Sequence, residues 1–266
     1  CRQSVNDQVV LVTGAAGSIG SELCRQVITF QPVELHLLDN NESGLFDLAA
    51  ELAAISPQTI IKLWPASVVD ERKVNEVFNQ VRPQLVYHAA AYKHVPMLES
   101  NPDEAFRANV LGTLNVATAA RTYQAGTFVL ISTDKAVRPT SIMGATKRIA
   151  ELMVLALARE SEHTRFVAVR FGNVMGSRGS VIPFFLEKRK TGVLPITDPR
   201  MTRFNISLQE GVDMVLWSIE NAWGGEILVP KIPSYRITDV AQAVAPEAEQ
   251  RVVGIRPGEK IHEEMI

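Results

Sequence analysis

The chain has 266 residues, of which 27 are Lys or Arg and 29 are Asp or Glu, so its formal net charge is −2. Hydrophobic residues make up 46% and charged residues 21%, a composition that excludes a mainly disordered chain. The near-neutral charge argues against a nucleic-acid-binding protein, and no apolar run is long enough to span a bilayer. The two cysteines and five histidines show neither a disulfide framework nor metal-ligand spacing, so no metal site is expected.

Apolar, β-branched runs alternate with helical patterns through the first two thirds of the chain. Runs that are apolar on both faces are typical of strands buried between two helix layers, which are parallel. Right-handed crossovers then give an α/β fold with a doubly wound parallel sheet. The alternating elements are expected at residues 9–13, 18–30, 33–39, 45–55, 60–64, 69–80, 85–89, 104–123, 127–132, 142–160 and 165–171.

This alternation ends at Phe171. Gly, Pro and Arg are frequent over residues 172–204, and the spacing of Ser207 and Glu210 predicts a capping box at the start of a new helix. We therefore expect one domain over residues 1–171 and a smaller lobe over 172–266, lying at the carboxyl ends of the strands. The helix at 207–221 is expected to pack back on the first domain.

A glycine-rich turn links the first predicted strand to the first predicted helix. Glycines at this turn allow a tight bend and let a pyrophosphate approach the helix N-terminus. The alternative is a plain glycine-rich turn, which the strand before it and the helix after it disfavour. The residues expected to bind a dinucleotide here are Gly14, Ala16, Gly17, Ser18, Ile19 and Gly20.

Asp39 ends the second predicted strand. A carboxylate at this position can accept hydrogen bonds from the adenosine ribose hydroxyls and would repel a 2′-phosphate. Asn40, the next residue, is expected to contact the cofactor too, and no Lys or Arg directly follows to bind such a phosphate, so NAD is favoured over NADP. Ser67 and Val68 follow the third strand, where the adenine edge would lie, although an ordinary loop explains them equally well.

Several longer motifs resemble a known family. The glycine spacing, the segment 88–96 and Ser132-Thr-Asp-Lys resemble the extended short-chain dehydrogenase/reductase superfamily. The segments 132–139, 170–183, 197–204 and 256–265 resemble those of the bacterial UDP-N-acetylglucosamine 4,6-dehydratases of polysaccharide and glycan biosynthesis. The resemblance covers nearly the whole chain. It implies a Rossmann-type NAD-binding domain and a lobe that binds UDP-N-acetylglucosamine.

One position departs from the superfamily pattern. Its members carry Tyr-x-x-x-Lys on one helix face, where the lysine lowers the pKa of the tyrosine that acts as base. Here Met143 takes the tyrosine position, and Lys147 is left to bind the nicotinamide ribose. The long, membrane-anchored branch of the dehydratases resembles this chain in carrying Met there. From that branch, and because the chain starts at Cys1 rather than at Met, we expect a soluble catalytic piece of a protein tethered at the cytoplasmic face of the inner membrane.

The resemblance implies oxidation of the hexose at C4 by NAD, loss of water across C5 and C6, and reduction at C6, giving a UDP-4-keto-6-deoxy-N-acetylhexosamine. Thr133, Asp134 and Lys135 follow the fifth predicted strand at its carboxyl end. We expect Thr133 to hydrogen-bond O4 and Asp134 to donate a proton to O6 and to handle the O4 proton. Lys135 is expected to be the C5 base. A solvated ion pair is the alternative interpretation of the last two.

Other residues match the family motifs. Ala89, Ala90 and Ala91 are expected beside the cofactor, and Tyr92, Lys93 and His94 beside the hexose, although Lys93 is equally well explained as a solvated loop charge. Asn109 is expected to support the cofactor site or to relay a water. The residues expected to hold the UDP-sugar are Asn173, Arg178, Ser180, Val181, Thr197, Arg200, Met201, Arg203, Arg256, Glu259 and Lys260.

Two other functions stay open at this point. A nucleotide-sugar 4-epimerase of the same fold needs neither an acid at O6 nor a base at C5. A catalytically silent NAD(H)-binding module is supported only by Met143. A homo-oligomer, formed through the helices at 104–123 and 142–160, is also expected from the superfamily. The stereochemistry at C5 stays open, with retention favoured by the family branch.

Overall fold

The structure is a computed structural model that describes residues 5–176 and 180–266. In this part of the chain seven parallel strands form one sheet in the order β10-β6-β5-β4-β1-β2-β3. This is the doubly wound parallel sheet that the sequence predicts. The strands are β1 (Val9–Thr13), β2 (Glu34–Asp39), β3 (Ile60–Pro65), β4 (Leu85–His88), β5 (Thr127–Thr133), β6 (Arg165–Phe171) and β10 (Ile227–Leu228).

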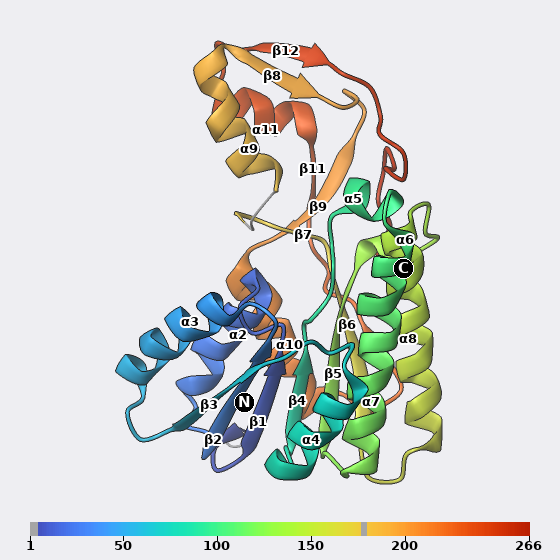
Figure 1. Ribbon diagram of the computed structural model, residues 1–266. Coiled ribbons are helices and arrows are strands. Elements are labelled where there is room, and N and C mark those ends of the chain that lie inside the picture. The colour runs from blue at the N-terminus through green and yellow to red at the C-terminus, as the bar shows by residue number, and fades with distance from the viewer. Residues whose placement is uncertain (1–4, 177–179) are drawn as a thin grey trace.

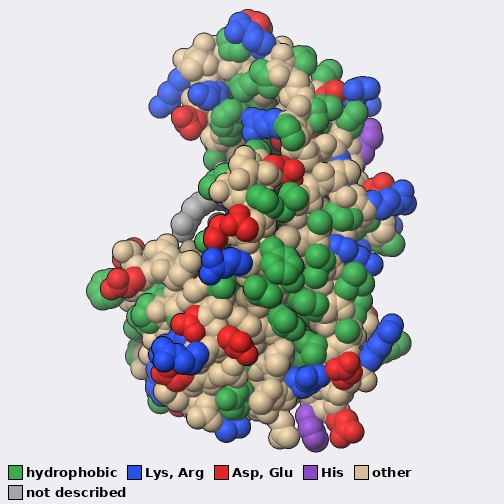
Figure 2. Space-filling model, turned by 45° about the vertical axis from the view of Figure 1, so that its right-hand side comes forward, with side chains coloured by type: hydrophobic (Ala, Val, Ile, Leu, Met, Phe, Trp, Pro, Cys, Tyr) green, Lys and Arg blue, Asp and Glu red, His purple; other side chains and the backbone are tan. Residues whose placement is uncertain are grey.

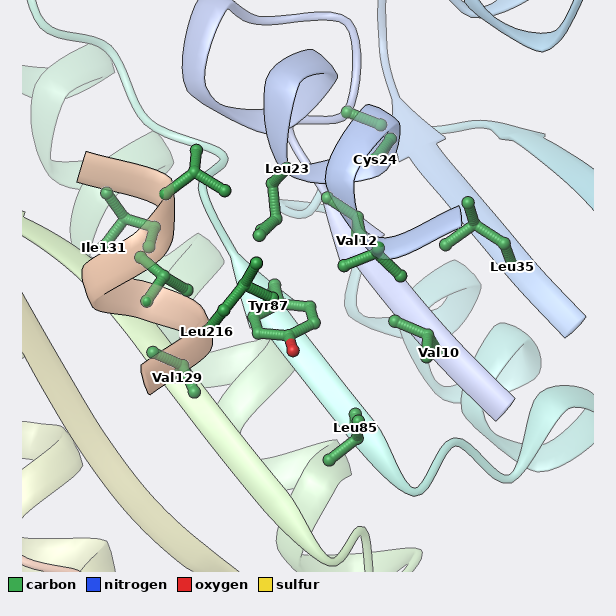
Figure 3. Close-up of a cluster of buried hydrophobic side chains, with 14 of the residues drawn as sticks. Val10, Val12, Leu23, Cys24, Leu35, Leu85, Tyr87, Val129, Ile131 and Leu216 are labelled. Atoms are coloured by element: carbon green, nitrogen blue, oxygen red, sulfur yellow. The ribbon is translucent and has the colours of Figure 1, made fainter. Parts of the chain in front are cut away.

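Helices cover both faces of the sheet (Figure 1). One face carries α2 (Ser18–Ile28), α3 (Glu42–Ile55) and α10 (Leu208–Asn221), and the other carries α4 (Glu71–Val81), α7 (Gly112–Thr122) and α8 (Ile142–Glu160). Figure 3 shows part of the core under the first layer, where Tyr87 of β4 lies among Val12, Leu216 and their neighbours. Burial of these apolar side chains holds the helices against the sheet.

The segment predicted as one helix over 104–123 is instead broken into three pieces. They are α6 (Pro102–Phe106), a π-helical turn η1 (Arg107–Leu111) and α7. The wider turn of η1 carries the buried Asn109, and such turns are frequent at functional sites. A further short helix, α5 (Val95–Glu99), was not predicted.

The expectation that the strands are buried on both faces is wrong for β3. Ile60 is 49% exposed and Leu63 is 37% exposed. The reason is that β3 lies at the edge of the sheet and pairs only with β2. In contrast, the predicted capping box is confirmed, because the Ser207 side chain accepts from the Glu210 N–H while the Glu210 carboxylate accepts from the Ser207 N–H.

The elements after Phe171 lie in two places. β7 (Asn173–Val174), α9 (Val181–Lys188), β8 (Val193–Ile196), β9 (Thr202–Ile206), β11 (Ser234–Arg236), α11 (Ile237–Val244) and β12 (Glu249–Val252) lie beyond the carboxyl ends of the sheet strands (Figure 1). Their apolar core includes Phe185, Leu194 and Ile237. By contrast, α10 packs on α2 and β6, and β10 extends the main sheet. No helix among the described residues is long and apolar enough to cross a membrane.

Candidate active site

A cavity of about 470 Å³ lies at the glycine-rich turn after β1. Gly14 has a φ of +69°, and a Cβ there would lie 2.5 Å from the backbone nitrogen of Ala90, so the turn requires glycine. A Cβ at Gly20 would collide with the carbonyl oxygen of Gly14. Without side chains, these positions let β1, α2 and the end of β4 approach one another closely. The turn and the N-terminus of α2 can therefore hold a pyrophosphate.

The Asp39 carboxylate lines this cavity in a fixed orientation. Its Oδ2 accepts from the Ala16 N–H at 3.0 Å and its Oδ1 accepts from the Asn41 N–H at 2.9 Å. Asn41 in turn caps α3 by accepting from the Gly44 N–H. The sheet end thus presents a negative charge to the cavity, and the cradle and this charge together fit NAD.

The cavity lining contains most of the residues predicted to bind the cofactor. These are Gly14, Ala16, Gly17, Asp39, Asn40, Ser67, Val68, Ala89, Ala90 and Ala91, whereas Ser18, Ile19, Gly20, Asn109 and Lys147 are not in the lining. Sequence reasoning missed Leu38, Asn41, Ala66, Val69, Glu104, Arg107 and Ala108, and it expected Tyr92 at the hexose. Glu104 lies in α6 and Arg107 begins η1, and neither carries a motif signal in the sequence.

Asn109 organises the loop after β4. Its Oδ1 accepts from the Tyr92 N–H at 2.8 Å, and its Nδ2 donates to the Tyr92 carbonyl at 3.0 Å and to Thr146 Oγ1 at 3.1 Å. The side chain therefore joins the β4 loop to α8. Tyr92, Lys93 and His94 all lie in this loop, and His94 directly precedes α5.

His88 and Lys147 are buried side by side beneath the site. Thr13 Oγ1 and Thr113 Oγ1 lie 2.7 Å and 3.0 Å from the two ring nitrogens of His88, so this histidine is a satisfied core residue. Burial lowers its pKa to about 3, with a further contribution from Lys147. Lys147 Nζ donates to the Ile131 carbonyl at 2.6 Å, and burial lowers its pKa to about 8 although Glu151 opposes this.

Thr133, Asp134 and Lys135 form a short turn at the carboxyl end of β5. Thr133 Oγ1 donates to Asp134 Oδ1 at 2.9 Å, and Lys135 Nζ donates to the same oxygen at 2.9 Å. Asp134 is fully buried, and its Oδ2 has no hydrogen-bond partner among the described residues. The interpretation of Asp134 and Lys135 as a solvated ion pair is wrong on this point, because the carboxylate lies in the protein interior.

Two further side chains face Lys135 from distant parts of the chain. Asn173 Oδ1, in β7, accepts from Lys135 Nζ at 3.1 Å, and Glu263 Oε1 lies 3.8 Å from the same nitrogen. The structure thus brings Asn173, predicted as a nucleotide ligand, to the turn of Thr133, Asp134 and Lys135. Sequence reasoning missed Glu263, although it lies inside the motif at 256–265.

Met143 lies one helical turn before Lys147 on α8. Its side chain is 3% exposed and packs in a small apolar cluster with Leu98 and Ala105. The Thr146 hydroxyl donates to its carbonyl at 2.8 Å. A thioether in this environment has no proton to exchange.

The remaining predicted substrate residues are scattered. Arg203 donates to the carbonyls of Thr202, Lys260 and Ile261, and Lys260 Nζ donates to the Val137 carbonyl, so both side chains hold the C-terminal segment. A cavity of about 70 Å³ joins Arg203, Glu259 and Lys260 to Lys135 and Glu263.

The other members of this set lie apart from that small cavity. Met201 is buried in the lobe core, the exposed Arg200 pairs with Asp198, and Arg256 is exposed. Ser180 and Val181 begin α9, Thr197 follows β8, and Arg178 lies outside the described residues.

Comparison with known proteins identifies the family. A family model described as "Polysaccharide biosynthesis protein" matches residues 10–266. The chain belongs to this family. This confirms the resemblance drawn from the sequence motifs.

Individual members of the family give more detail. The chain is 44% identical to the capsular polysaccharide biosynthesis protein CapD of Staphylococcus aureus over 99% of its own length and 46% of that protein. It is 40% identical to a UDP-N-acetylglucosamine 4,6-dehydratase (inverting) of Campylobacter jejuni, over 98% of the chain and 78% of the relative. It thus spans about half the length of the first of these relatives.

Solved structures share the fold. Pen from Bacillus thuringiensis superposes with a TM-score of 0.92 at 32% identity, covering 98% of this chain and 84% of Pen. DesIV from Streptomyces venezuelae, a dTDP-glucose 4,6-dehydratase with NAD bound, gives a TM-score of 0.84 at 20% identity, covering 97% and 88%. At that identity, the likeness to DesIV concerns the fold alone.

Proposed function

We propose that the chain is the catalytic part of a UDP-N-acetylglucosamine 4,6-dehydratase, a lyase that uses NAD. The observation that carries this proposal is the turn of Thr133, Asp134 and Lys135 at the carboxyl edge of the sheet, where Thr133 Oγ1 and Lys135 Nζ both donate to the buried Asp134 carboxylate. We propose that Asp134 and Lys135 act there as an acid–base pair. Such pairs are needed to remove the C5 proton and to protonate the departing O6. The relatives of C. jejuni that carry the dehydratase name, at 40% and 39% identity, support it.

The residues at the glycine-rich turn, Asp39 and Lys147 are proposed to hold the parts of NAD. NAD, when bound, supplies the chemistry that oxidises C4 and later reduces C6. The Gly14 turn and the N-terminus of α2 hold its pyrophosphate, and Asp39 accepts hydrogen bonds from its adenosine ribose. Lys147 places a buried amine toward the nicotinamide ribose, at a depth where burial lowers its pKa to about 8.

In this proposal one residue orients the hexose and two residues move the protons. Thr133 hydrogen-bonds O4 and orients the hexose. Asp134 removes the O4 proton, because Met143 cannot, and then donates that proton to O6 as water leaves. Lys135, in its neutral form, removes the C5 proton and later returns a proton to C5. Asn173 and Arg256 are proposed to bind the diphosphate and uridine.

A 4-epimerase is the second candidate function. Relatives named UDP-glucose 4-epimerase, among them that of Rickettsia rickettsii at 37% identity, support it. Against it stands the pairing of Lys135 with the buried Asp134, for which epimerisation has no use. Incubation with UDP-N-acetylglucosamine and NAD, followed by chromatographic separation of the sugars and mass spectrometry, separates the candidates. A product lighter by one water supports the dehydratase, an isomer of equal mass supports the epimerase, and unchanged substrate supports the silent module.

We also propose that two copies pair through α7 and α8. Large hydrophobic side chains lie exposed along these helices and the preceding α6 and η1, and Figure 2 shows apolar side chains gathered on this side of the molecule. They include Phe106, Leu111, Leu114, Ile149 and Leu152. Light scattering on the purified chain tests this: a monomer at every concentration would contradict it. We further propose that a longer parent protein carries a membrane anchor, and that residue 171 divides the NAD-binding domain from the substrate-binding lobe.

A further inference from the structure

Glu263 lies buried between two ammonium groups at the edge of the catalytic turn. Its side chain is 4% exposed, with Oε1 3.8 Å from Lys135 Nζ and Oε2 3.8 Å from Lys260 Nζ. Its Oε2 has no hydrogen-bond partner among the described residues. Among the described residues, Asp134 and Glu263 are the two carboxylates that pair with Lys135.

The proposed reaction leaves one proton without a destination. Lys135 Nζ donates to both Asp134 and Asn173, and two carboxylates face it, so the resting lysine is held as an ammonium. A base at C5 must be a neutral amine. Asp134 cannot take the surplus proton, because it has already accepted the proton of O4. Asn173 offers only a carboxamide oxygen, which does not accept a proton outright.

We propose that Glu263 accepts a proton from Lys135 and thereby frees the amine to act at C5. In this step an N–H bond of Lys135 breaks and an O–H bond forms on Glu263. The neutral amine then takes the C5 proton, and Asp134 gives the O4 proton to O6, which leaves as water. Lys135 next returns its proton to C5, and Glu263 returns the borrowed one to Lys135. Every proton is thus accounted for, and the water carries away the proton that left O4.

The geometry allows this transfer without rearrangement of the backbone. The small cavity of about 70 Å³ that both side chains line is large enough for a bridging water, and a distance of 3.8 Å is closed by such a water or by rotation of the side chains. Glu263 acts through Lys135 and is therefore a positioning residue for the proton rather than a catalytic residue. The inference rests on the proposed dehydratase function.

Glu263→Gln keeps the size of the side chain and removes its ability to take a proton. C4 oxidation does not need Glu263, whereas elimination does. The variant should therefore accumulate enzyme-bound NADH and the 4-keto hexose in a single turnover, while dehydration slows by about 100-fold. Glu263→Asp should recover part of the rate. The matched control is Glu264→Gln, whose exposed carboxylate pairs with Arg138 on the surface and which should behave as wild type.

A merely structural role predicts another pattern. Oxidation and elimination would then fall together, with no accumulation of NADH, and that result would overturn the inference. Wild-type dehydration by Glu263→Gln would overturn it too.

A second measurement does not depend on turnover. Acetylation of Lys135 by acetic anhydride, followed by mass spectrometry across a pH series, reports when the amine loses its proton. The Glu263 carboxylate lies 3.8 Å from this nitrogen, so Glu263→Gln should move the midpoint to lower pH. Glu264→Gln should leave it in place. The dehydration rates of wild type and variant are therefore compared below both midpoints, where the amine is protonated and still needs an acceptor for its proton. If wild type fails to dehydrate the substrate, the proposed function fails, whereas an unmoved midpoint refutes the coupling of Glu263 to Lys135 whatever the reaction is.

Discussion

The Asn109 carboxamide holds both backbone groups of Tyr92, accepting from its N–H at 2.8 Å and donating to its carbonyl at 3.0 Å. One side chain in η1 thereby fixes the loop that follows β4. Because Tyr92 also lines the large cavity, this clamp connects the π-helical turn to cofactor binding.

Asn109→Ala should destabilise the fold and weaken NAD binding. The change leaves the Tyr92 N–H and carbonyl without their side-chain partner, which costs about 2 kcal/mol in the free energy of unfolding. Urea denaturation measures this loss, and calorimetry should show NAD binding weakened by about tenfold. Asn221→Ala, which removes an exposed side chain from the end of α10, is the control and should change neither quantity. Equal stability of the two variants would contradict the clamp.

Asp39→Ala should weaken NAD binding and reduce the preference for NAD over NADP. The variant loses an ionic hydrogen-bond acceptor, so the Kd for NAD should rise by about tenfold or more. It also loses the charge that repels a 2′-phosphate, so the ratio of the two Kd values should fall. Collapse of the turn alone would weaken both cofactors equally and leave that ratio unchanged. Asp47→Ala, in the exposed part of α3, is the matched control.

Lys147 should make stability rise with pH in the alkaline range. Burial lowers its pKa from 10.5 to about 8, so below pH 8 the folded protein carries a desolvated ammonium. Below pH 8 the buried charge destabilises the folded state. Between pH 8 and 10.5 the folded lysine is neutral while the unfolded one is still charged, so the free energy of unfolding rises with pH over this range. The fall in pKa corresponds to about 3 kcal/mol.

Urea unfolding of wild type and Lys147→Met, at pH 7 and at about pH 10, checks this sign. The difference in unfolding free energy should move in favour of wild type by about 2 to 3 kcal/mol at the higher pH. A difference that is constant with pH would show that the amine keeps its ordinary titration in the folded protein.

Glu151→Gln should be strongly destabilising. The Glu151 carboxylate is fully buried and accepts two hydrogen bonds from Arg170, one from Ser132 and one from Arg148. Burial raises the pKa of this carboxyl, but these hydrogen bonds outweigh it and hold the pKa below its usual value.

Removal of the Glu151 charge leaves the buried Arg170 guanidinium uncompensated, which costs about 3 kcal/mol in unfolding free energy. Thermal and urea unfolding measure the cost. Glu160 lies on the same helix as Glu151 and pairs with Arg121 of α7 at the surface. Glu160→Gln breaks this exposed pair and should cost less than about 1 kcal/mol. A Glu151 variant as stable as the Glu160 variant would contradict the buried network.

The sheet and its helices were predictable because local patterns specify them. The Ser141 side chain caps α8 by accepting from the Gly144 N–H, and the helix runs over Ile142–Glu160 as expected from its apolar pattern. The strand β6 likewise covers Arg165–Phe171, as predicted from a continuous apolar run. The π-helical turn was not predictable, since an extra residue in a helix leaves the apolar pattern nearly unchanged.

The candidate site was predictable where backbone geometry demands one residue type. Gly14 must be glycine and Asp39 ends a strand beside it, so the cofactor cradle could be located from the sequence. Glu263 could not, because its contact with Lys135 joins segments far apart in the chain. Nor could the sequence tell that Arg203 is used to hold the carbonyls of Lys260 and Ile261.

The most direct test of the central claim is the dehydration rate of Asp134→Asn. A carboxamide keeps the shape of the side chain but neither removes the O4 proton nor donates one to O6. With UDP-N-acetylglucosamine and NAD, mass spectrometry should show the product lighter by one water forming at least about 100-fold more slowly than in wild type, while NAD binding stays unchanged. Dehydration at the wild-type rate would contradict the assignment of the buried Asp134–Lys135 pair as the acid–base centre.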